Sequence, residues 1–367
     1  MHLFDDFYQG KKVLVTGHTG FKGSWLTLWL LEMGAEVAGV SAYLPSDPCN
    51  FEVMGLKNHI RHIEMDIRNF EPLKKVFEEF QPQVVFHLAA QAIVRRSFDD
   101  PRLTFDTNIM GTVNVLECVR EHECVEAAVI ITSDKCYRNS EWVWGYRETD
   151  ALGGKDPYSA SKGCAEIVIG SYCDSYFRDE NRKKVASTRA GNVIGGGDWG
   201  RDRIVPDCVR AWSAGNEVIV RSPLATRPWQ HVLEPLSGYL WLGVLLEQGK
   251  VRTGEAFNFG PRSEVIQPVS SLVQSFKTYW EKAQWSIAEP DPGMKESRFL
   301  KLCCDKALSL LQWEAILSFE ETVELTAEWY RWFYDNGEDM LKFSSQQIKR
   351  YCELAVERGV KWLKLDF

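Results

Sequence analysis

The sequence predicts an α/β fold in which helices cover both faces of a parallel sheet. Strand-like and helix-like segments alternate through the first half of the chain, and a glycine-rich turn follows the first strand. Such alternation builds βαβ units, and their right-handed crossovers place helices on both sides of one sheet. The length of 367 residues suits two lobes that share an interface better than one simple core.

The elements of this sheet can be placed in chain order. The strands, rich in apolar and β-branched residues, are expected at residues 12–16, 36–40, 60–65, 84–88, 127–132 and 184–189. The helices between them are expected at residues 22–33, 71–80, 104–122 and 157–176. Apolar strands without polar alternation are typical of a sheet that is buried on both faces, so the economical topology is a Rossmann-like doubly wound sheet.

The alternation stops after the last of these strands. Residues 191–200 contain five glycines and are expected to form a loop. The remaining chain mixes short strands, loops and helices, with a helix pattern at residues 320–334. We therefore expect residues 1–190 to form the doubly wound domain, with segments around 228–262 returning to it. Residues 191–367 are expected to form mainly a smaller mixed α/β lobe.

Composition argues against several classes of protein. The 43 Lys and Arg against 51 Asp and Glu give a net charge of -8, which disfavours nucleic-acid binding. No apolar run reaches the roughly 18 residues of a membrane helix, and the first residues lack the pattern of a signal peptide. The ten cysteines show no metal-ligand spacing, so we expect no bound metal and reduced thiols in a cytoplasmic protein.

A glycine motif lies between the first strand and its helix. Gly17, Gly20 and Gly23 are spaced G-x-x-G-x-x-G, one residue different from the G-x-G-x-x-G dinucleotide fingerprint. Glycine permits the tight turn and lets a pyrophosphate approach the backbone, and the helix directs its first amides toward the phosphates. A plain tight turn would use the same residues, but the position after the first strand favours a dinucleotide site.

The residue that distinguishes NAD from NADP is not evident. An acidic residue after the second strand normally binds the adenosine ribose, but residues 40–43 read Val-Ser-Ala-Tyr, with no Asp, Glu or Arg. Asp66 follows the third strand and is a candidate acceptor for the adenine amino group. A helix N-cap is the alternative role for Asp66.

A tyrosine and a lysine form the candidate catalytic pair. Tyr158 and Lys162 are four residues apart on a predicted helix, so they share one face. The ammonium group is expected to lower the pKa of Tyr158 from about 10 toward neutrality. Such a tyrosine takes a proton from a hydroxyl group while hydride leaves for a nicotinamide. Ser133 can hydrogen-bond the same hydroxyl, and Asn108 either shapes the long helix or holds a water near Lys162.

Together, the glycine motif, Asn108, Ser133 and the Tyr-Lys pair resemble extended short-chain dehydrogenases/reductases that act on nucleotide sugars. The resemblance runs through nearly the whole chain, and further typical segments are residues 86–91, 108–117 and 189–195. Most 4,6-dehydratases of other nucleotide sugars carry Asp-Glu after the hydroxyl residue. This chain carries Asp134 and Lys135 there, as does the branch that dehydrates CDP-glucose.

The resemblance implies a mechanism. Tyr158 would accept the proton of the sugar C4 hydroxyl as hydride passes from C4 to NAD⁺. Lys135, when neutral, would remove the C5 proton, and protonated Asp134 would donate to the departing C6 hydroxyl. Return of the hydride to C6 would give CDP-4-keto-6-deoxy-glucose. A water molecule or Tyr158 is the alternative C5 base.

The resemblance also implies which residues form the binding sites. The cofactor, NAD, is expected to contact Gly17, Thr19, Gly20, Phe21, Gly23, Asp66, Ile67, Leu88, Ala89, Ala90, Asn108, Tyr158 and Lys162. The nucleotide sugar is expected to contact Gln91, Asn192, Arg203, Arg227 and Arg298. For Arg203 and Arg298, a solvated surface charge is the alternative. Residues 295–305 depart from the CDP-glucose branch, so the resemblance supports 4,6-dehydration more strongly than cytosine as the base.

Other interpretations use the same motifs. A nucleotide-sugar 4-epimerase or decarboxylase would share the Tyr-Lys pair, but an epimerase needs no acid for C6, so Asp134 and Lys135 argue against it. A 4,6-dehydratase of another nucleotide hexose and a catalytically idle NAD-binding regulator are the remaining alternatives. Related enzymes pair through two long helices, here 104–122 and 157–176, so a homodimer or homotetramer is expected.

Overall fold

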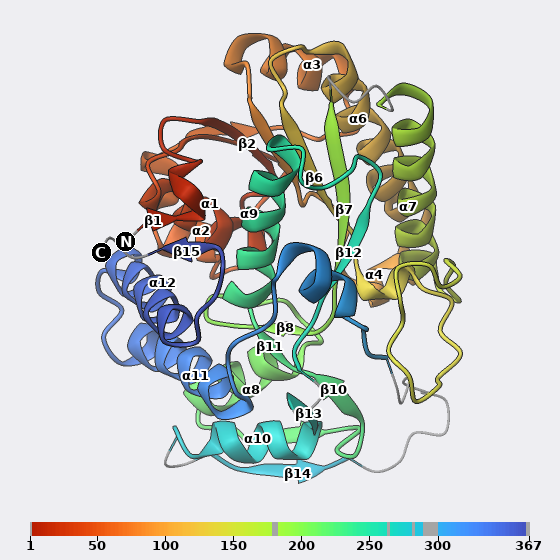
Figure 1. Ribbon diagram of the computed structural model, residues 1–367. Helices are drawn as coiled ribbons and strands as arrows, with labels where there is room; N and C mark the ends of the chain where they lie inside the picture. The colour runs from red at the N-terminus through yellow and green to blue at the C-terminus, as the bar shows by residue number, and fades with distance from the viewer. Residues whose placement is uncertain (1, 178–182, 263–264, 281–282, 289–299, 365–367) are drawn as a thin grey trace.

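A computed structural model describes residues 2–177, 183–262, 265–280, 283–288 and 300–364 of the chain. At its centre lies a seven-stranded sheet in the order β12-β7-β6-β5-β2-β3-β4, and every neighbouring pair is parallel (Figure 1). The strands are β2 (Lys12–Thr16), β3 (Glu36–Ser41), β4 (Arg61–Glu64), β5 (Val84–His87), β6 (Ala127–Ile131), β7 (Lys184–Ala190) and β12 (Ala256–Phe259). The winding reverses between β2 and β5, which confirms the predicted doubly wound Rossmann fold.

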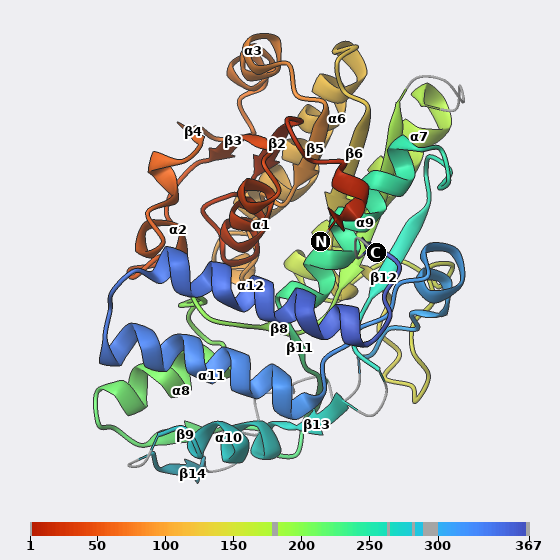
Figure 2. The same ribbon diagram turned by 60° about the vertical axis from the view of Figure 1, so that its left-hand side comes forward.

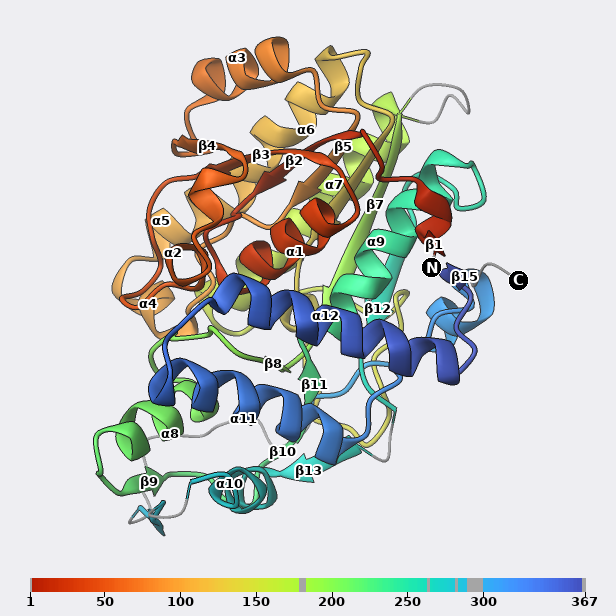
Figure 3. The same ribbon diagram turned by 90° about the vertical axis from the view of Figure 1, so that its left-hand side faces the viewer.

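Helices cover both faces of this sheet (Figure 3). One face carries α1 (Phe21–Glu32) and α9 (Leu233–Glu247), and the other carries α3 (Phe70–Phe80), α6 (Gly111–Glu121) and α7 (Pro157–Tyr176). The pleat of β2 divides its side chains between the two layers. Val13 and Val15 belong to the core under α1 and α9, and Leu14 belongs to the core under the other three helices. Because both faces are buried, the strands are apolar throughout.

The predicted elements of the first half agree with the structure to within about one residue, except for the helix expected at residues 104–122. That helix begins earlier, as α5 (Pro101–Phe105), and passes through a π-helical turn at Asp106–Met110 before it continues as α6. Asp100 caps α5 by accepting a hydrogen bond from the amide of Leu103. The prediction of a uniform α-helix is therefore wrong at the π-turn, a feature that often marks functional sites.

The second half of the chain adds β12 and α9 to the sheet layers and otherwise forms short strands and further helices. Its short strands pair as β8 (Val193–Ile194) with β11 (Gln230–His231), β9 (Val218–Val220) with β14 (Trp285–Ile287), and β10 (Thr226–Pro228) with β13 (Ile266–Pro268). The remaining helices include α2 (Asn50–Val53), α4 (Val94–Asp99), α8 (Ile204–Ser213), α10 (Val269–Lys277), α11 (Phe319–Asp335) and α12 (Met340–Glu357). The α11 helix agrees with the helix predicted at residues 320–334.

The two ends of the described chain lie side by side. β1 (His2–Leu3) pairs antiparallel with β15 (Leu363–Lys364), and α12, which precedes β15, passes across one end of α1 (Figure 2). None of the helices in the described part of the chain is long and apolar enough to cross a membrane.

Candidate active site

A large cleft runs along the carboxyl ends of the parallel strands and into the second lobe. Its volume is about 1380 Å³, and its walls come from the turns after β2, β3, β4, β5 and β6, from α7, and from the second lobe. Ligand pockets for one small molecule usually measure roughly 300–1,000 Å³. The cleft is therefore large enough for two ligands, and it lies where doubly wound sheets bind them.

The glycine turn after β2 is shaped for a close backbone approach. Gly17 has a φ of +78°, and a Cβ there would lie 2.6 Å from the amide nitrogen of Ala89. A Cβ at Gly23 would lie 2.1 Å from the carbonyl oxygen of Gly17. No side chain caps the N-terminus of α1 at Gly20, so its first amides face the cleft. These features fit a dinucleotide pyrophosphate, and Phe21 also lines the cleft.

The end of the cleft beside β3 carries neutral polar groups where an acidic residue is usual. The amide of Thr19 donates to Ser41 Oγ at 3.3 Å, and Thr19 Oγ1 donates to the carbonyl oxygen of Tyr43 at 2.9 Å. His18 contacts Ser41 Oγ at 3.1 Å and His62 at 2.7 Å. Burial and the neighbouring His62 lower the pKa of His18 to about 4, so the ring is neutral. Sequence reasoning missed this pair.

Asp66 and the apolar residues expected at the cofactor site line the cleft. The Asp66 carboxylate is held by Arg68 at 2.7 Å, and this hydrogen bond lowers the pKa of Asp66. The N-cap of α3 is Asn69, so the alternative N-cap role for Asp66 is wrong. The other expected residues of this wall are Ile67, Leu88, Ala89 and Ala90.

The predicted catalytic residues come together on one wall. Ser133 follows β6, and its hydroxyl donates to Asp134 Oδ1 at 3.0 Å. Lys135 Nζ lies 3.9 Å from the same oxygen. The Asp134 side chain is only 6% exposed, whereas that of Lys135 is 36% exposed. Tyr158 and Lys162 are buried one turn apart on α7 and line the same cleft.

The expected lowering of the Tyr158 pKa is wrong for the protein alone. Burial raises the pKa of Tyr158 to about 12, and a hydrogen bond with Ser133 only partly opposes this effect. Burial also lowers the pKa of Lys162 to about 8, against the charge of Glu166. The four-residue spacing places both side chains in the cleft, but desolvation of the phenolate outweighs the neighbouring cations.

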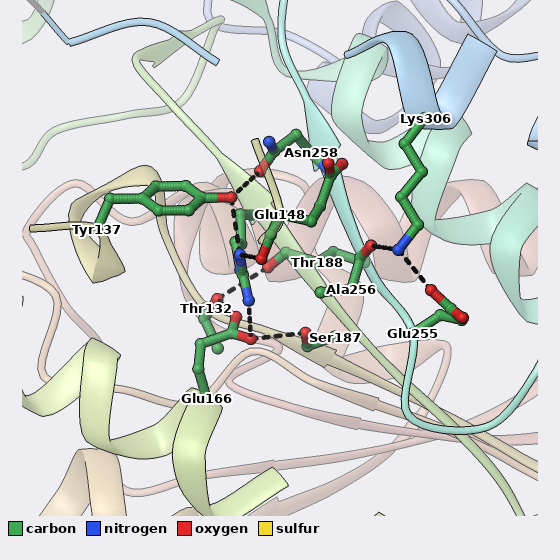
Figure 4. A network of polar contacts seen from close by, with 11 residues as sticks. Thr132, Tyr137, Glu148, Glu166, Ser187, Thr188, Glu255, Ala256, Asn258 and Lys306 are labelled. Carbon is green, nitrogen blue, oxygen red and sulfur yellow. Dashed lines mark hydrogen bonds and ion pairs between the residues drawn. The ribbon is translucent and has the colours of Figure 1, made fainter. Parts of the chain in front are cut away.

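A buried ion pair supports this wall from behind (Figure 4). Glu166 lies one turn beyond Lys162 on α7, and Arg189 on β7 donates to it at 2.7 Å. Both side chains are at most 4% exposed. Thr132 and Ser187 also donate to Glu166. The carboxylate therefore accepts hydrogen bonds from the end of β6 and from β7, which hold α7 against the sheet.

The same arginine reaches the loop that follows Lys135. Arg189 Nη1 donates to the hydroxyl of Tyr137 at 2.7 Å and to the carbonyl oxygen of Glu148 at 3.0 Å. The Tyr137 hydroxyl donates in turn to Asn258 Oδ1 on β12 at 2.8 Å (Figure 4). The segment that carries the candidate acid and base is thus fastened to two strands of the sheet.

Three of the five residues expected to bind the nucleotide sugar offer side chains at the cleft wall. Asn192, Arg203 and Arg227 line the cleft. Arg203 Nη1 is paired with Asp198 at 2.7 Å, and Arg227 Nη1 donates to the carbonyl oxygen of Thr226 at 2.9 Å. Arg298 lies outside the described residues.

Gln91 and Asn108 have structural partners. The Gln91 side-chain amide donates to Thr104 Oγ1 at 2.9 Å and to the carbonyl oxygen of Ile93 at 3.1 Å, although the residue borders the cleft. Asn108 accepts from the amide of Gln91 at 2.8 Å and donates to Ser161 Oγ at 2.8 Å. Asn108 lies on the π-turn and shapes the turn after β5 from behind, and it is not among the residues that line the cleft.

A doubly wound sheet with this glycine turn, and with a serine, tyrosine and lysine at the end of β6 and on α7, defines the short-chain dehydrogenase/reductase class. Comparison with known proteins specifies the family. A family model described as GDP-mannose 4,6 dehydratase matches residues 14–326. The chain belongs to this family of extended short-chain dehydrogenases/reductases, which confirms the resemblance found in the sequence.

Individual relatives agree with this assignment. CDP-glucose 4,6-dehydratase of Salmonella typhimurium is 47% identical over 352 residues, which are 94% of this chain and 97% of that protein. An epimerase of Methanothermobacter thermautotrophicus has a TM-score of 0.78 and 27% identity, covering 92% of this chain and 97% of its own. UDP-glucose 4-epimerase of Thermus thermophilus, solved with NAD, has a TM-score of 0.72 and 26% identity, covering 87% and 99%.

Proposed function

We propose that this protein is an NAD-dependent 4,6-dehydratase that converts CDP-glucose to CDP-4-keto-6-deoxy-glucose. The observation that carries the proposal is the pairing of Asp134 with Lys135 beside Ser133, on the cleft wall that also holds Tyr158. An oxidation alone needs only the tyrosine and its neighbours. A carboxyl group and an amine at adjacent positions provide the acid and base that elimination of water also needs.

Four side chains of the cleft have separate roles in the proposed reaction. Ser133 and Tyr158 hydrogen-bond the C4 hydroxyl, and Tyr158 takes its proton as a phenolate, a form that the positive charge of bound NAD⁺ would favour against the effect of burial. The turn at Gly17, Gly20 and Gly23 would hold NAD⁺, which would supply the hydride acceptor for C4 and the hydride donor for C6, so that the net reaction would be loss of water. Lys135 removes the C5 proton and gives it back to C5 when hydride reaches C6, and Asp134 gives a proton to the departing C6 hydroxyl. Gly191 keeps the space beside the acid open, because a Cβ there would lie 3.3 Å from Asp134 Oδ2.

The basic residues at the far side of the cleft suit the pyrophosphate of the substrate. Arg227 offers the planar guanidinium that pairs with phosphate oxygens, and Asn192 adds a neutral donor. Arg203 also lines the cleft, with Asp198 as its partner. The cytosine preference rests on the 47% identical relative, which is named for CDP-glucose.

The proposal includes the organisation of the enzyme. Residues 1–190, with the segments around 228–262, bind NAD, and residues 191–367 mainly bind the nucleotide sugar. We place the enzyme in the cytoplasm as a homodimer or homotetramer. Apolar side chains exposed on α7 support self-association, with Ile167 61% and Tyr176 58% exposed. Light scattering of the purified protein would measure the oligomeric state.

Replacement of the acid or the base tests the assigned roles. In Asp134→Ala and Lys135→Ala, we expect hydride transfer from C4 to continue and elimination to stall, since general acids and bases contribute roughly 10²–10⁴-fold. After CDP-glucose is added, the absorbance of the reduced cofactor should rise and stay high. Formation of the 4-keto-6-deoxy product should fall by that factor. Lys349→Ala, on an exposed part of α12, is the control. Unchanged product formation in both variants would reject the two roles.

A substrate panel tests the base preference and the competing activities. The protein is incubated separately with CDP-, dTDP-, GDP- and UDP-glucose, and the alkaline absorbance of a 4-keto product is followed. We expect CDP-glucose to react fastest. A faster reaction with another nucleotide would reassign the substrate, an epimer without a ketone would indicate an epimerase, and NAD binding without any turnover would indicate a regulator.

A further inference from the structure

A lysine next to the cofactor turn, Lys22, has no role in the mechanism above. Lys22 lies in the first turn of α1, between Gly20 and Gly23, and its side chain lines the cleft. The residue is only partly exposed. Within the described residues, no carboxylate lies within 4.0 Å of its ammonium group. Its recorded contact is with the ring of Tyr239 on α9, whose centroid is 6.0 Å from Lys22 Nζ.

This position is unfavourable for a lysine. The N-terminus of a helix carries the positive end of the helix dipole, so a cation in the first turn is repelled. Partial burial removes water from the ammonium group, and the contact with Tyr239 compensates weakly. Burial lowers the pKa of Lys22 to about 8, so the group is still a cation at pH 7. Burial and the helix dipole both destabilise a charged lysine at this position, which makes Lys22 a candidate for a functional role.

The ring contact of Lys22 identifies the part of the cleft that it faces, because Tyr239 lies on α9, which packs against β6 and β7. Asp134, Arg203 and Lys162 are the groups whose charges shift its pKa, and all three line the cleft around Tyr158. The ammonium group therefore lies toward β6 and β7, whose ends border the catalytic wall, and its pKa responds to the charges of that wall. A nicotinamide that exchanges hydride with a sugar held by Tyr158 would bind in this same cleft, which Lys22 also lines.

We propose that Lys22 favours the reduced form of the bound nicotinamide cofactor and so promotes removal of hydride from the sugar. When hydride leaves C4, the alcohol becomes a ketone, the hydroxyl proton goes to Tyr158, and the positive charge of the oxidised nicotinamide ring is cancelled. A fixed cation nearby is repelled by the oxidised ring, and this repulsion disappears when the ring is reduced. This role rests on the proposed function. It assigns to Lys22 an effect on the equilibrium of the first step, the transfer of hydride from C4 to the cofactor.

The test compares the affinities of the two cofactor forms in the absence of any sugar. Dissociation constants for NAD⁺ and NADH are measured at pH 7 by calorimetry on cofactor-free protein and on Lys22→Met, Lys22→Arg and Lys349→Met. We expect Lys22→Met to shift the ratio of the two constants toward NAD⁺ by about tenfold or more, as expected for loss of a unit charge at several ångströms. Lys22→Arg should retain most of the wild-type ratio, and Lys349→Met all of it.

Each other outcome overturns the proposal. Equal weakening of both forms would make Lys22 a contact for the cofactor phosphates, and unchanged constants with weaker CDP-glucose binding would make it a substrate contact. Misfolding is checked by thermal unfolding, where loss of an unfavourable charge should leave Lys22→Met at least as stable as the wild type. A normal 4-keto product with an unchanged ratio would reject this inference alone, whereas failure to bind either form would reject the NAD-dependent function.

Discussion

Gly17 and Gly23 meet at the base of the cofactor turn, and no other residue fits at either position. The Cβ of any larger residue at Gly23 would lie 2.1 Å from the Gly17 carbonyl oxygen, a backbone atom that cannot move aside without opening the turn. Gly20 is less constrained, since its Cβ would lie 3.1 Å from the same oxygen. The three glycines of the motif are therefore not equally constrained: Gly17 and Gly23 must lack a side chain, whereas Gly20 has more space.

A single methyl group at Gly23 should disable the cofactor site. We expect Gly23→Ala to cost roughly 1–3 kcal/mol through overpacking and to weaken binding of both NAD⁺ and NADH in calorimetry. Gly170→Ala on α7 is the matched control, because nothing lies within 4 Å of its Cβ. Its better helix propensity should add up to about 1 kcal/mol of stability. Equal cofactor affinity in Gly23→Ala and wild type would contradict the close-approach model.

On the scale of elements, α7 links the chemistry to the sheet. Tyr158, Lys162 and Glu166 occupy successive turns, and only the first two face the cleft. Glu166 turns inward to Arg189 on β7, which holds the loop after β6 through Tyr137 (Figure 4). Two elements that each carry part of the candidate catalytic machinery thus share one buried ion pair.

Removal of one partner of this pair should destabilise the protein strongly. Arg189→Leu would leave the Glu166 carboxylate buried without its cation, which typically costs about 3–5 kcal/mol. Urea unfolding of Arg189→Leu measures this loss. The double variant Arg189→Leu/Glu166→Leu should be less destabilised than Arg189→Leu, since no unpaired charge remains. Additive losses in the double variant would show that the two charges do not depend on each other.

On the scale of the whole molecule, Glu234 joins three distant segments. It lies on α9 and accepts the amides of Ile316 at 2.9 Å and Leu317 at 2.6 Å. Its other oxygen accepts the hydroxyl of Tyr351 on α12 at 2.8 Å. The helix that covers the sheet is thereby joined to the segment before α11 and to the terminal helix. Burial raises the pKa of Glu234 to about 7, against these hydrogen bonds.

This raised pKa makes the stability of the fold depend on pH. Between about 4.5 and 7, the unfolded state ionises Glu234 while the folded state keeps its proton, so stability is full below 4.5 and falls as pH rises through 7. The loss corresponds to roughly 3 kcal/mol for a fully buried group. We expect the difference in unfolding free energy between wild type and Glu234→Gln to change by that order from pH 5 to pH 8. A constant difference would contradict the assignment.

Local patterns in the sequence were sufficient for much of this protein. The apolar strands, the glycine turn and the capped helix at Pro157–Tyr176 depend on neighbours within a few residues, so their bounds were predicted closely. The four-residue spacing of Tyr158 and Lys162 and the adjacency of Asp134 and Lys135 are local too. The chemistry that these residue types can perform could therefore be read before the fold.

Only the tertiary structure decided how those groups are surrounded. Desolvation of Tyr158, the partner of Glu166 and the direction of Lys22 depend on segments far away in the chain. The pairing of β12 with β7 and of the chain's two ends is likewise long-range. A sequence specifies which residues lie near one another along the chain, whereas burial and electric field depend on every segment that folds against a group.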